Sequence, residues 1–432
     1  MKRFLCWVLA FMLVFSLTAC NIQGPAGEEG NKGTDISPNQ DANGADAKTG
    51  QSGQPDAAKD TNAGGYDYEA AESMKVGILQ PLTGSMSYYG DRIKWALGHE
   101  AEKINEAGGV LGKPIELAYY DIGTNDESMT VSACEKAIRD SETQGFSAFY
   151  GPINGAPCLA CAPLVTEAQI PTLYISTSQN IRDGGYEYMW NHRIPADIAN
   201  SVLAGCAKEL WGVNNVAVLY YTLAGAIVEK DAFVAGCEEY GIDVKAEIAY
   251  QIDDVDFTAQ ATQVAKLKDE IDGVFLVCDN GETPALVIAA LHAYGFDKVI
   301  MTNNAGMNDT TISTAEALSP GATANMKSTT EVNLQDPEVA AWAEELIAID
   351  SSFDLPGWYE ACAVDALRLM CQAAELQNSI DPVQINQGLA KIDSFEGLTA
   401  TYTCQGDNTL RNSVWACEVQ DGKVVATKKF EW

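Results

Sequence analysis

The residue types and spacing of Cys158 with Cys161, and of His99 with Glu100, suggest a possible catalytic or metal-binding role in this 432-residue chain. Cys158-Leu159-Ala160-Cys161 has the spacing of a redox dithiol, and a helix start there would favour a thiolate. The surrounding sequence lacks a thioredoxin-like pattern, so a structural disulfide or buried thiols are the favoured interpretation. His99-Glu100 is not followed by a second histidine four residues on, which excludes the zinc-protease signature.

The remaining chemistry-bearing residues do not form a catalytic pattern either. His192 and His292 lie in separate segments, and the sequence has no Gly-x-Ser-x-Gly elbow and no phosphate-binding loop. We therefore expect no catalytic residue, no metal and no cofactor. The net charge of −33 argues against nucleic acid as a partner, because such binding depends on Lys and Arg neutralising phosphates.

The N-terminus has the features of an export signal. Lys2 and Arg3 precede an apolar run of 16 residues, 4–19, which is short for a membrane span but typical of a signal peptide. The run ends in Leu17-Thr18-Ala19-Cys20, which resembles the lipobox of bacterial lipoproteins. That resemblance implies a signal peptide at 1–19 and lipid attachment at Cys20. A signal anchor with an incidental cysteine is the alternative.

A polar segment follows the predicted lipid site. Residues 21–73 are rich in Gly, Ala, Asp, Asn, Gln, Ser and Pro and poor in large aliphatic residues. Such a composition buries too little apolar surface to offset chain entropy. We therefore predict a lipidated cysteine and disordered tether at 20–73, mooring a folded part to the outer face of a cell membrane.

Ten cysteines would remain after processing. They are Cys134, Cys158, Cys161, Cys206, Cys237, Cys278, Cys362, Cys371, Cys404 and Cys417. Several lie among Ala, Leu and Val on segments with a helical pattern, where cysteine acts as a small hydrophobic residue. We expect most of them to be buried free thiols. Cys404 and Cys417, which flank a predicted hairpin, are the best disulfide candidates, and other pairings stay open.

From residue 74 onward, short apolar strands alternate with helical patterns. Strands are predicted at 76–79, 115–121, 146–151, 172–176, 216–220, 244–250, 273–278 and 298–302. Helices are predicted at 91–107, 126–143, 157–168, 227–240, 257–270 and 283–295, and the tail adds helices at 336–350 and 357–378 and strands at 399–403, 414–418 and 424–430. This alternation predicts an α/β protein with two doubly wound parallel-sheet lobes joined by a hinge.

The order of these segments divides the chain between the lobes. We expect 74–195 plus 327–410 to form the first lobe and 196–326 plus 411–432 the second. In open parallel sheets, ligands bind outside the carboxyl ends of the strands. The loops expected to carry function are 80–90, 150–157, 176–180, 221–226, 279–283 and 303–308.

The opening of the folded part resembles a known family. Val76-Gly77-Ile78-Leu79-Gln80-Pro81-Leu82-Thr83-Gly84 with Tyr89-Gly90-Asp91 is similar to the start of the leucine/isoleucine/valine-binding proteins, which are type I periplasmic-binding-protein-like receptors of ABC importers. The resemblance continues through residues 104–115, Tyr119-Tyr120-Asp121 and 171–176. It weakens in the second lobe and covers roughly 74–430 in all.

The resemblance implies a set of ligand-binding residues. In the first lobe, Tyr89 would contact the ligand's side chain, while small residues after the third and fourth strands would bind its carboxylate. These residues are Asn154, Gly155, Ala156, Ser176, Thr177 and Ser178. Backbone N–H groups near helix starts bind carboxylates without a cation. As alternatives, Tyr89 is a packing residue at a helix start and the serines an N-cap cluster.

The second lobe departs from the family pattern. The corresponding positions are Gly225, Asp279, Asn280 and Asn304. Asn304 stands where family members have the acid that pairs with the ligand's ammonium. Asp279 or Glu282 could supply the charge, because a desolvated ammonium needs a negative group nearby. Otherwise the ligand is a short amide, a urea-like compound or a small carboxylate.

The resemblance also implies partners. We expect a small amino-acid-like ligand, with a branched-chain or other hydrophobic amino acid favoured, and delivery of that ligand to ABC permease subunits. We expect a monomer held at the membrane by its lipid. A receptor of the same fold that reports its ligand to a signalling partner is the rival function, since fold alone does not decide between them.

Overall fold

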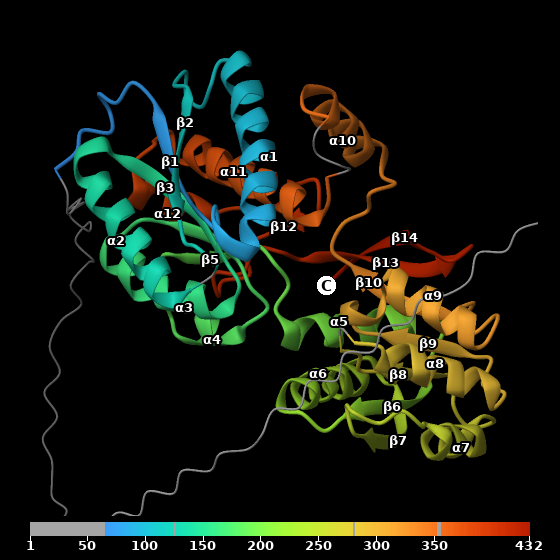
Figure 1. The fold of residues 1–432 in the computed structure, drawn as a ribbon. Helices are drawn as coiled ribbons and strands as arrows, with labels where there is room; N and C mark the ends of the chain where they lie inside the picture. The colour runs from blue at the N-terminus through green and yellow to red at the C-terminus, as the bar shows by residue number, and fades with distance from the viewer. Residues whose placement is uncertain (1–64, 125, 280, 352–355) are drawn as a thin grey trace, which may run out of the picture. The chain divides into compact units, whose positions relative to one another are not determined.

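The computed structural model describes residues 65–124, 126–279, 281–351 and 356–432 of the chain (Figure 1). The predicted signal peptide, Cys20 and most of the predicted tether lie outside the described residues, as does Asn280. Within the described residues, no helix is both long and apolar enough to cross a membrane.

The first sheet has five strands, all paired in parallel, in the order β2-β1-β3-β4-β5. The strands are β1 (Met74–Gln80), β2 (Ile115–Asp121), β3 (Phe146–Ile153), β4 (Thr172–Ile175) and β5 (Met189–Asn191). The connecting helices are η1 (Gly84–Met86), α1 (Ser87–Glu106), α2 (Glu127–Gln144), α3 (Gly155–Glu167) and α4 (Gln179–Asp183).

The second sheet has seven strands in the order β14-β13-β10-β9-β8-β6-β7. Five are parallel: β6 (Asn215–Tyr221), β7 (Asp243–Tyr250), β8 (Gly273–Leu276), β9 (Val299–Thr302) and β10 (Met326–Thr330). An antiparallel hairpin of β13 (Ser413–Gln420) and β14 (Lys423–Glu431) extends the sheet beside β10. The helices are α5 (Ala196–Glu209), α6 (Ala224–Tyr240), α7 (Thr258–Leu267), α8 (Thr283–Ala293), η2 (Asn304–Gly306) and α9 (Asp309–Leu318).

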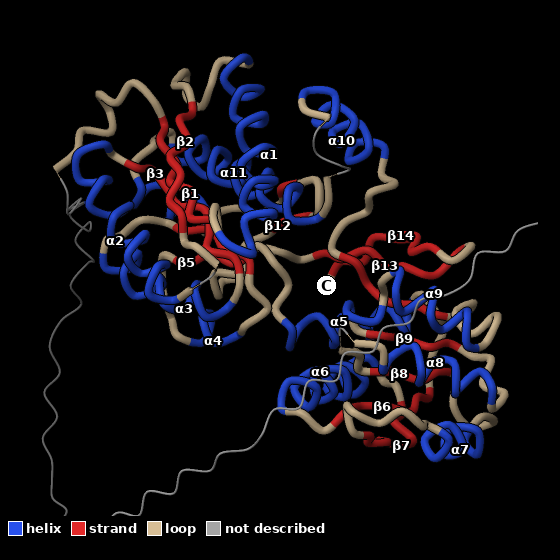
Figure 2. Tube along the Cα trace, in the orientation of Figure 1, coloured by secondary structure: helices blue, strands red, loops and turns tan. Residues whose placement is uncertain are grey.

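Strand residues alternate between two cores, one on each face of a sheet. In β6, Val216 and Val218 pack with α5 and α6, while Ala217 and Leu219 pack with α7, α8 and α9. This two-residue period follows from the pleat of a strand, and burial on both faces explains why the strands read as continuous apolar runs. Helices lie against both sheets (Figure 2), so the predicted doubly wound α/β fold is confirmed.

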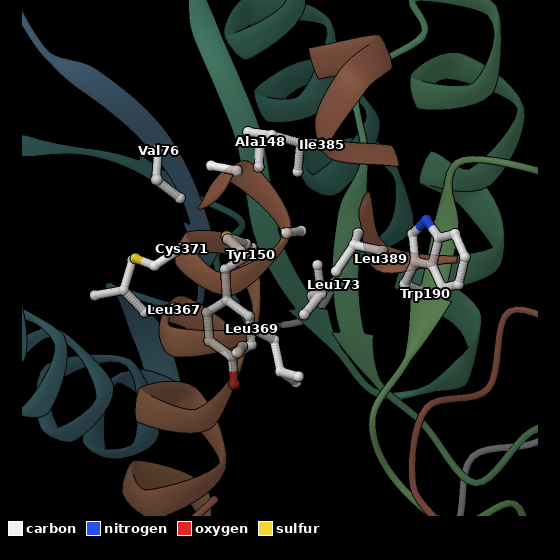
Figure 3. Close-up of a cluster of buried hydrophobic side chains, with 14 of the residues drawn as sticks. Val76, Ala148, Tyr150, Leu173, Trp190, Leu367, Leu369, Cys371, Ile385 and Leu389 are labelled. Atoms are coloured by element: carbon white, nitrogen blue, oxygen red, sulfur yellow. The ribbon is translucent and has the colours of Figure 1, made fainter. Parts of the chain in front are cut away.

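The tail helices join the first sheet. α11 (Trp358–Gln377) and α12 (Pro382–Leu389) pack with α1 over one face of the first sheet, while α2, α3 and α4 pack over the other. Figure 3 shows Leu367, Cys371, Ile385 and Leu389 beside strand residues such as Val76 in this core. α10 (Pro337–Ile349) and the short strands β11 (Phe395–Glu396) and β12 (Thr401–Tyr402) complete the segment.

Two predicted boundaries differ from the structure. Residues 65–73, assigned to the tether, include Tyr68, which is buried against the first core and donates its hydroxyl to the Phe146 carbonyl (3.1 Å). Two tyrosines in this stretch provide apolar surface that the rest of the tether lacks. Residues 327–330, assigned to the first lobe, belong to β10 and pair with β9 and β13 of the second sheet.

All ten cysteines in the described residues are free thiols, and nine of them are buried. The expectation of mostly buried thiols is therefore confirmed, but the proposed Cys404–Cys417 pair is wrong. Cys404 packs against the core of the first sheet. Cys417 lies in β13, opposite Ser328 of β10, and the hairpin that contains it begins after Cys404.

Within the described residues, the chain crosses between the two sheets three times, and each crossing carries one charged residue of a largely buried cluster. Arg193 lies between β5 and α5, Glu331 follows β10, and Arg411 lies between β12 and β13. The Glu331 carboxylate accepts a hydrogen bond from Arg193 Nε (3.0 Å) and lies 3.7 Å from Arg411 Nη1. We call these three residues the crossover triad.

His192, beside Arg193 at the first crossing, is expected to make the protein sensitive to acid. It is fully buried, and burial lowers its pKa from 6.5 to about 3, with a further contribution from Arg411. Below pH 6.5 the unfolded chain binds a proton that the folded chain does not. Folding stability is therefore lost as the pH falls towards 3, by about 1.4 kcal/mol per pH unit.

The His192→Gln variant tests this expectation, because Gln can still donate to the Cys362 carbonyl that lies 3.2 Å from His192 Nε2. Urea unfolding at pH 7 and pH 5 should show a loss about 2 kcal/mol larger in the unmodified protein than in the variant. Equal losses in the two proteins would contradict the assignment.

Candidate functional site

The start of α3 supplies backbone N–H groups at the carboxyl end of β3. Asn154 precedes the helix with φ +80°, and its side chain makes no capping hydrogen bond. Cys158 N–H already donates to the Asn154 carbonyl (3.2 Å), and Pro157 has no N–H. Within the described residues, Gly155 and Ala156 therefore keep available N–H groups at a helix start, where an anion is favoured.

The loop after β4 lies against this helix start. A side-chain carbon at Gly155 would come within 3.1 Å of Ser178 Cβ and 3.4 Å of Ser176 Oγ, so glycine permits the close approach. The buried Ser176 Oγ accepts from Ser178 N–H (3.0 Å). Thr177 is exposed, and its carbonyl accepts from Ala196 N–H (3.1 Å) at the first crossing. The structure thus brings together two loops that are far apart in sequence.

Tyr89 lies in an aromatic pocket at the start of α1, after β1. Its ring is 4.9 Å from the Tyr359 ring and 5.6 Å from the Tyr88 ring, measured between centroids. The pocket has a volume of about 210 Å³ and is lined by Tyr88, Tyr89, Arg92, Gly357, Trp358, Tyr359 and Glu360. Tyr89 is half-buried, so it packs and also presents part of its ring. β1 is the neighbour of β3, which places Tyr89 at the same sheet edge as Gly155.

The charges beside the aromatic pocket already have partners. Arg92 forms a buried ion pair with Glu360, which also accepts from Gly357 N–H (3.1 Å). Arg193 of the crossover triad lies over the Trp358 ring, 4.5 Å from its centroid. An anionic ligand group would therefore meet backbone N–H groups and hydroxyls in the first lobe, rather than an uncommitted cation.

A larger hollow lies elsewhere on the first sheet. It has a volume of about 420 Å³ and is lined by Tyr119, Tyr120 and Asp121 of β2 and by residues of α2. It contains none of the predicted site residues. Asp121 there accepts from Leu82 N–H (2.9 Å), Gly123 N–H (2.8 Å) and Thr83 Oγ1 (2.6 Å), so its carboxylate orders the loop after β1.

In the second lobe, the predicted site residues are mostly exposed or hydrogen-bonded within their own loops. Gly225 is exposed in the first turn of α6. Asp279 is half-buried, and its Oδ1 accepts from Gly281 N–H (2.9 Å), which ties the carboxylate to its own loop. Asn304 is exposed in η2. Asn280 lies outside the described residues.

Asn303 and Glu229, which the sequence does not identify as site residues, hold together the loops at the carboxyl edge of the second sheet. Asn303 is buried; its Oδ1 accepts from Cys278 N–H (2.9 Å), and its Nδ2 donates to the Cys278 carbonyl (3.0 Å) and to Glu229 of α6. Burial raises the pKa of Glu229, although hydrogen bonds from Asn303 and Asn200 act in the opposite direction. Glu229 follows no strand directly, and an acid inside a helical pattern carries no sequence signal of a site.

The cysteines and histidines considered as candidates for catalysis or metal binding have structural roles. Cys158 and Cys161 are buried in the core under α3, and burial raises the pKa of the Cys158 thiol, which donates to the Pro152 carbonyl (3.2 Å). A redox role needs an accessible thiolate. His99 lies 3.3 Å from Glu345, and His292 Nδ1 lies 2.7 Å from Ser319 Oγ, in different parts of the fold. The part of the chain that the structure describes holds no group of residues able to bind a metal.

Comparison with known proteins agrees with this fold. Residues 73–423 match the family described as "Periplasmic binding protein". The leucine-, isoleucine-, valine-, threonine- and alanine-binding protein of Pseudomonas aeruginosa is 25% identical over 350 residues, which cover 79% of this chain and 88% of that protein.

Two solved structures share the fold. A putative branched-chain amino acid ABC transporter protein from Rhodospirillum rubrum has a TM-score of 0.71 at 18% identity, covering 82% of this chain and 100% of that one. The substrate-binding protein LivJ from Streptococcus pneumoniae, solved with isoleucine, has a TM-score of 0.60 at 20% identity, covering 83% and 100%.

The family match over most of the chain, and not the topology alone, identifies a solute-binding protein and not an enzyme. The chain belongs to the periplasmic binding protein family, and its resemblance to the type I members is confirmed.

Proposed function

We propose that this chain is an extracellular solute-binding lipoprotein of an ABC importer, and that it binds a small hydrophobic amino acid between its two lobes and delivers it to the permease. The observation that carries the proposal is the contact between the uncapped start of α3 and the Ser176–Ser178 loop. A carboxylate fits this geometry, because it gathers backbone N–H groups and hydroxyls without a cation.

The first lobe also offers a place for an apolar side chain. Tyr89 and Tyr359 are in ring contact beside the aromatic pocket, at the sheet edge that carries the α3 start. The relative from P. aeruginosa is named for leucine, isoleucine, valine, threonine and alanine, and the S. pneumoniae structure holds isoleucine. These names support a branched-chain or other hydrophobic amino acid as the ligand.

The mechanism requires no bond to be made or broken in this chain. A ligand that contacts both lobes stabilises the closed arrangement, because it binds that state more tightly than the open one. The permease would then select the closed form. Lipid attachment at Cys20 would keep the protein at the membrane surface, where delivery takes place. We expect the protein to act as a monomer.

A second candidate ligand class follows from the second lobe. Asn304 replaces the expected acid and is exposed, and the Asp279 carboxylate is bonded within its own loop. A short amide, a urea-like compound or a small carboxylate would not need an acid at either position. A signalling receptor that binds the same ligands remains the rival use of this site.

A thermal-shift screen of the purified protein separates these ligand classes. We expect leucine, isoleucine or valine to raise the stability by a few kcal/mol at saturation, through mass action. Amides, urea and small carboxylates serve as the competing set. Stabilisation by a member of that set, with no response to any amino acid, would keep the fold assignment and reject the proposed ligand.

A further inference from the structure

Glu229 is placed on the inner face of α6. Ala226 and Phe233, three residues before it and four after it, are both fully buried in the core between α6 and the second sheet. Residues at these spacings share one face of a helix, so Glu229 points towards the sheet and not away from it. It is half-buried at the carboxyl edge, where Asn303 of the loop after β9 and Asn200 of α5 hydrogen-bond to it.

Glu229 has amide partners but no cation. Among the described residues it takes part in no ion pair, and the neighbouring Lys230 pairs instead with Asp231 (2.6 Å) and Glu247 (2.8 Å). A partly desolvated carboxylate without a positive partner is costly, and the raised pKa of Glu229 is the expression of that cost. A bound cation would remove it.

The field of Glu229 reaches the ends of two strands. Burial raises the pKa of Tyr221, at the end of β6, and the charge of Glu229 raises it further. The pKa of Cys278, just after β8, is raised by burial, then by Asp279 and then by Glu229. Asp279 acts on the same two groups. This edge of the second sheet is therefore negative, whereas the first-lobe loops offer N–H groups. The two lobes match the two ends of a zwitterion.

Three exposed aliphatic residues precede Glu229 in the chain. Leu223, Ile227 and Val228 are large aliphatic residues at the start of α6, and each is exposed. Ile227 and Val228 lie on other faces of α6 than the inward-facing Glu229, so the place for the ligand's apolar chain is the aromatic pocket of the first lobe.

We propose that Glu229 is the acceptor for the ligand's ammonium group, in place of the family acid that Asn304 does not supply, so that this site selects hydrophobic α-amino acids. The inference rests on the proposed function and makes it specific. It assigns the charge to Glu229 rather than to Asp279, whose carboxylate is bonded to Gly281, or to the exposed Glu282.

The test compares leucine with 4-methylpentanoate, which is leucine without its ammonium group. We expect the unmodified protein to bind leucine at least tenfold more tightly than 4-methylpentanoate. Glu229→Gln should lose at least tenfold in leucine affinity and bind 4-methylpentanoate as before. Glu238→Gln is the matched control, since Glu238 is an exposed acid on the same helix, and it should change neither affinity.

Four results would overturn the inference. If Glu229→Gln binds leucine as tightly as the unmodified protein, Glu229 is not the acceptor and the proposed function stands. If Asp279→Asn loses leucine while Glu229→Gln does not, the acid is Asp279. If the unmodified protein binds 4-methylpentanoate and leucine equally tightly, no acidic residue contributes to binding of the ammonium group. This comparison needs only the unmodified protein, so it applies even if Glu229→Gln fails to fold. Binding of no amino acid at all would reject the proposed function together with the inference.

Discussion

Replacing Arg411 with Met is expected to lower the free energy of unfolding by about 3–5 kcal/mol, the usual cost of removing one partner of a buried ion pair. Arg411 is fully buried in the crossover triad. It donates from Nε to the Ser413 carbonyl (2.9 Å) and from Nη2 to the carbonyls of Glu331 (2.6 Å) and Thr399 (3.0 Å). Methionine would leave three carbonyls without this donor.

The size of the effect follows from the shared carboxylate. Glu331 keeps Arg193 as a partner in the variant, but loses the charge that neutralises its other oxygen, Oε2. The three crossing segments would then be held by fewer contacts, so we expect a broader unfolding transition as well as lower stability. Urea unfolding followed by circular dichroism measures both quantities.

Lys429→Met is the matched control, because Lys429 pairs with the exposed Glu396 (2.7 Å) at the surface. Surface pairs of this kind contribute about 0–1 kcal/mol. If the Arg411→Met and Lys429→Met variants lose the same small amount, the crossover triad is not a main source of stability.

The second large effect is expected at Tyr89. Tyr89→Ala should weaken ligand binding by tenfold or more, which corresponds to at least about 1.4 kcal/mol. The ring is half-buried against Tyr359 beside the pocket, so its removal takes away an apolar wall while the core under α1 stays intact. Calorimetric titration gives the affinity, and thermal unfolding without ligand checks the fold.

Two further variants sharpen the Tyr89 experiment. Tyr89→Phe keeps the ring and should keep most of the affinity, which separates ring contact from a hydrogen bond of the hydroxyl. Tyr294→Ala removes an exposed tyrosine at the end of α8 and should have no effect on binding. Unchanged affinity in Tyr89→Ala would remove Tyr89 from the site.

The fold could be predicted because buried strands have a recognisable sequence pattern. β6 and β8 are buried on both faces, so they read as unbroken apolar runs bounded by polar loops. The tail is harder to predict: α12 is only eight residues long, and the sequence pattern indicates no helix there, although Ile385 and Leu389 bury its inner face.

Long-range partners could not be predicted in the same way. Cys404 and Cys417 flank a turn-rich stretch, yet Cys417 lies in β13 of the second sheet, while Cys404 packs against the core of the first. The close approach of Gly155 to Ser176 depends on the register of β3 and β4. The sequence supported those residues through family resemblance, and the structure adds that they lie together.

Prediction of site residues from the sequence is least reliable at the carboxyl edge of the second sheet. Asn303 and Asn304 are adjacent, but Asn303 bonds to Cys278 and Glu229, while Asn304 is exposed. A one-residue difference in a loop cannot be resolved from spacing. Glu229 comes from a helix whose inner face is otherwise apolar, so only the packing of α6 brings it to the edge.

The most direct test of the account is a calorimetric titration of L-leucine into the purified protein. We predict one binding site per chain and heat that saturates, with isoleucine and valine competing for the same site. Saturable binding would support the proposed amino-acid-binding function. Absence of binding by any hydrophobic amino acid, together with saturable binding of a short amide or small carboxylate, would contradict it.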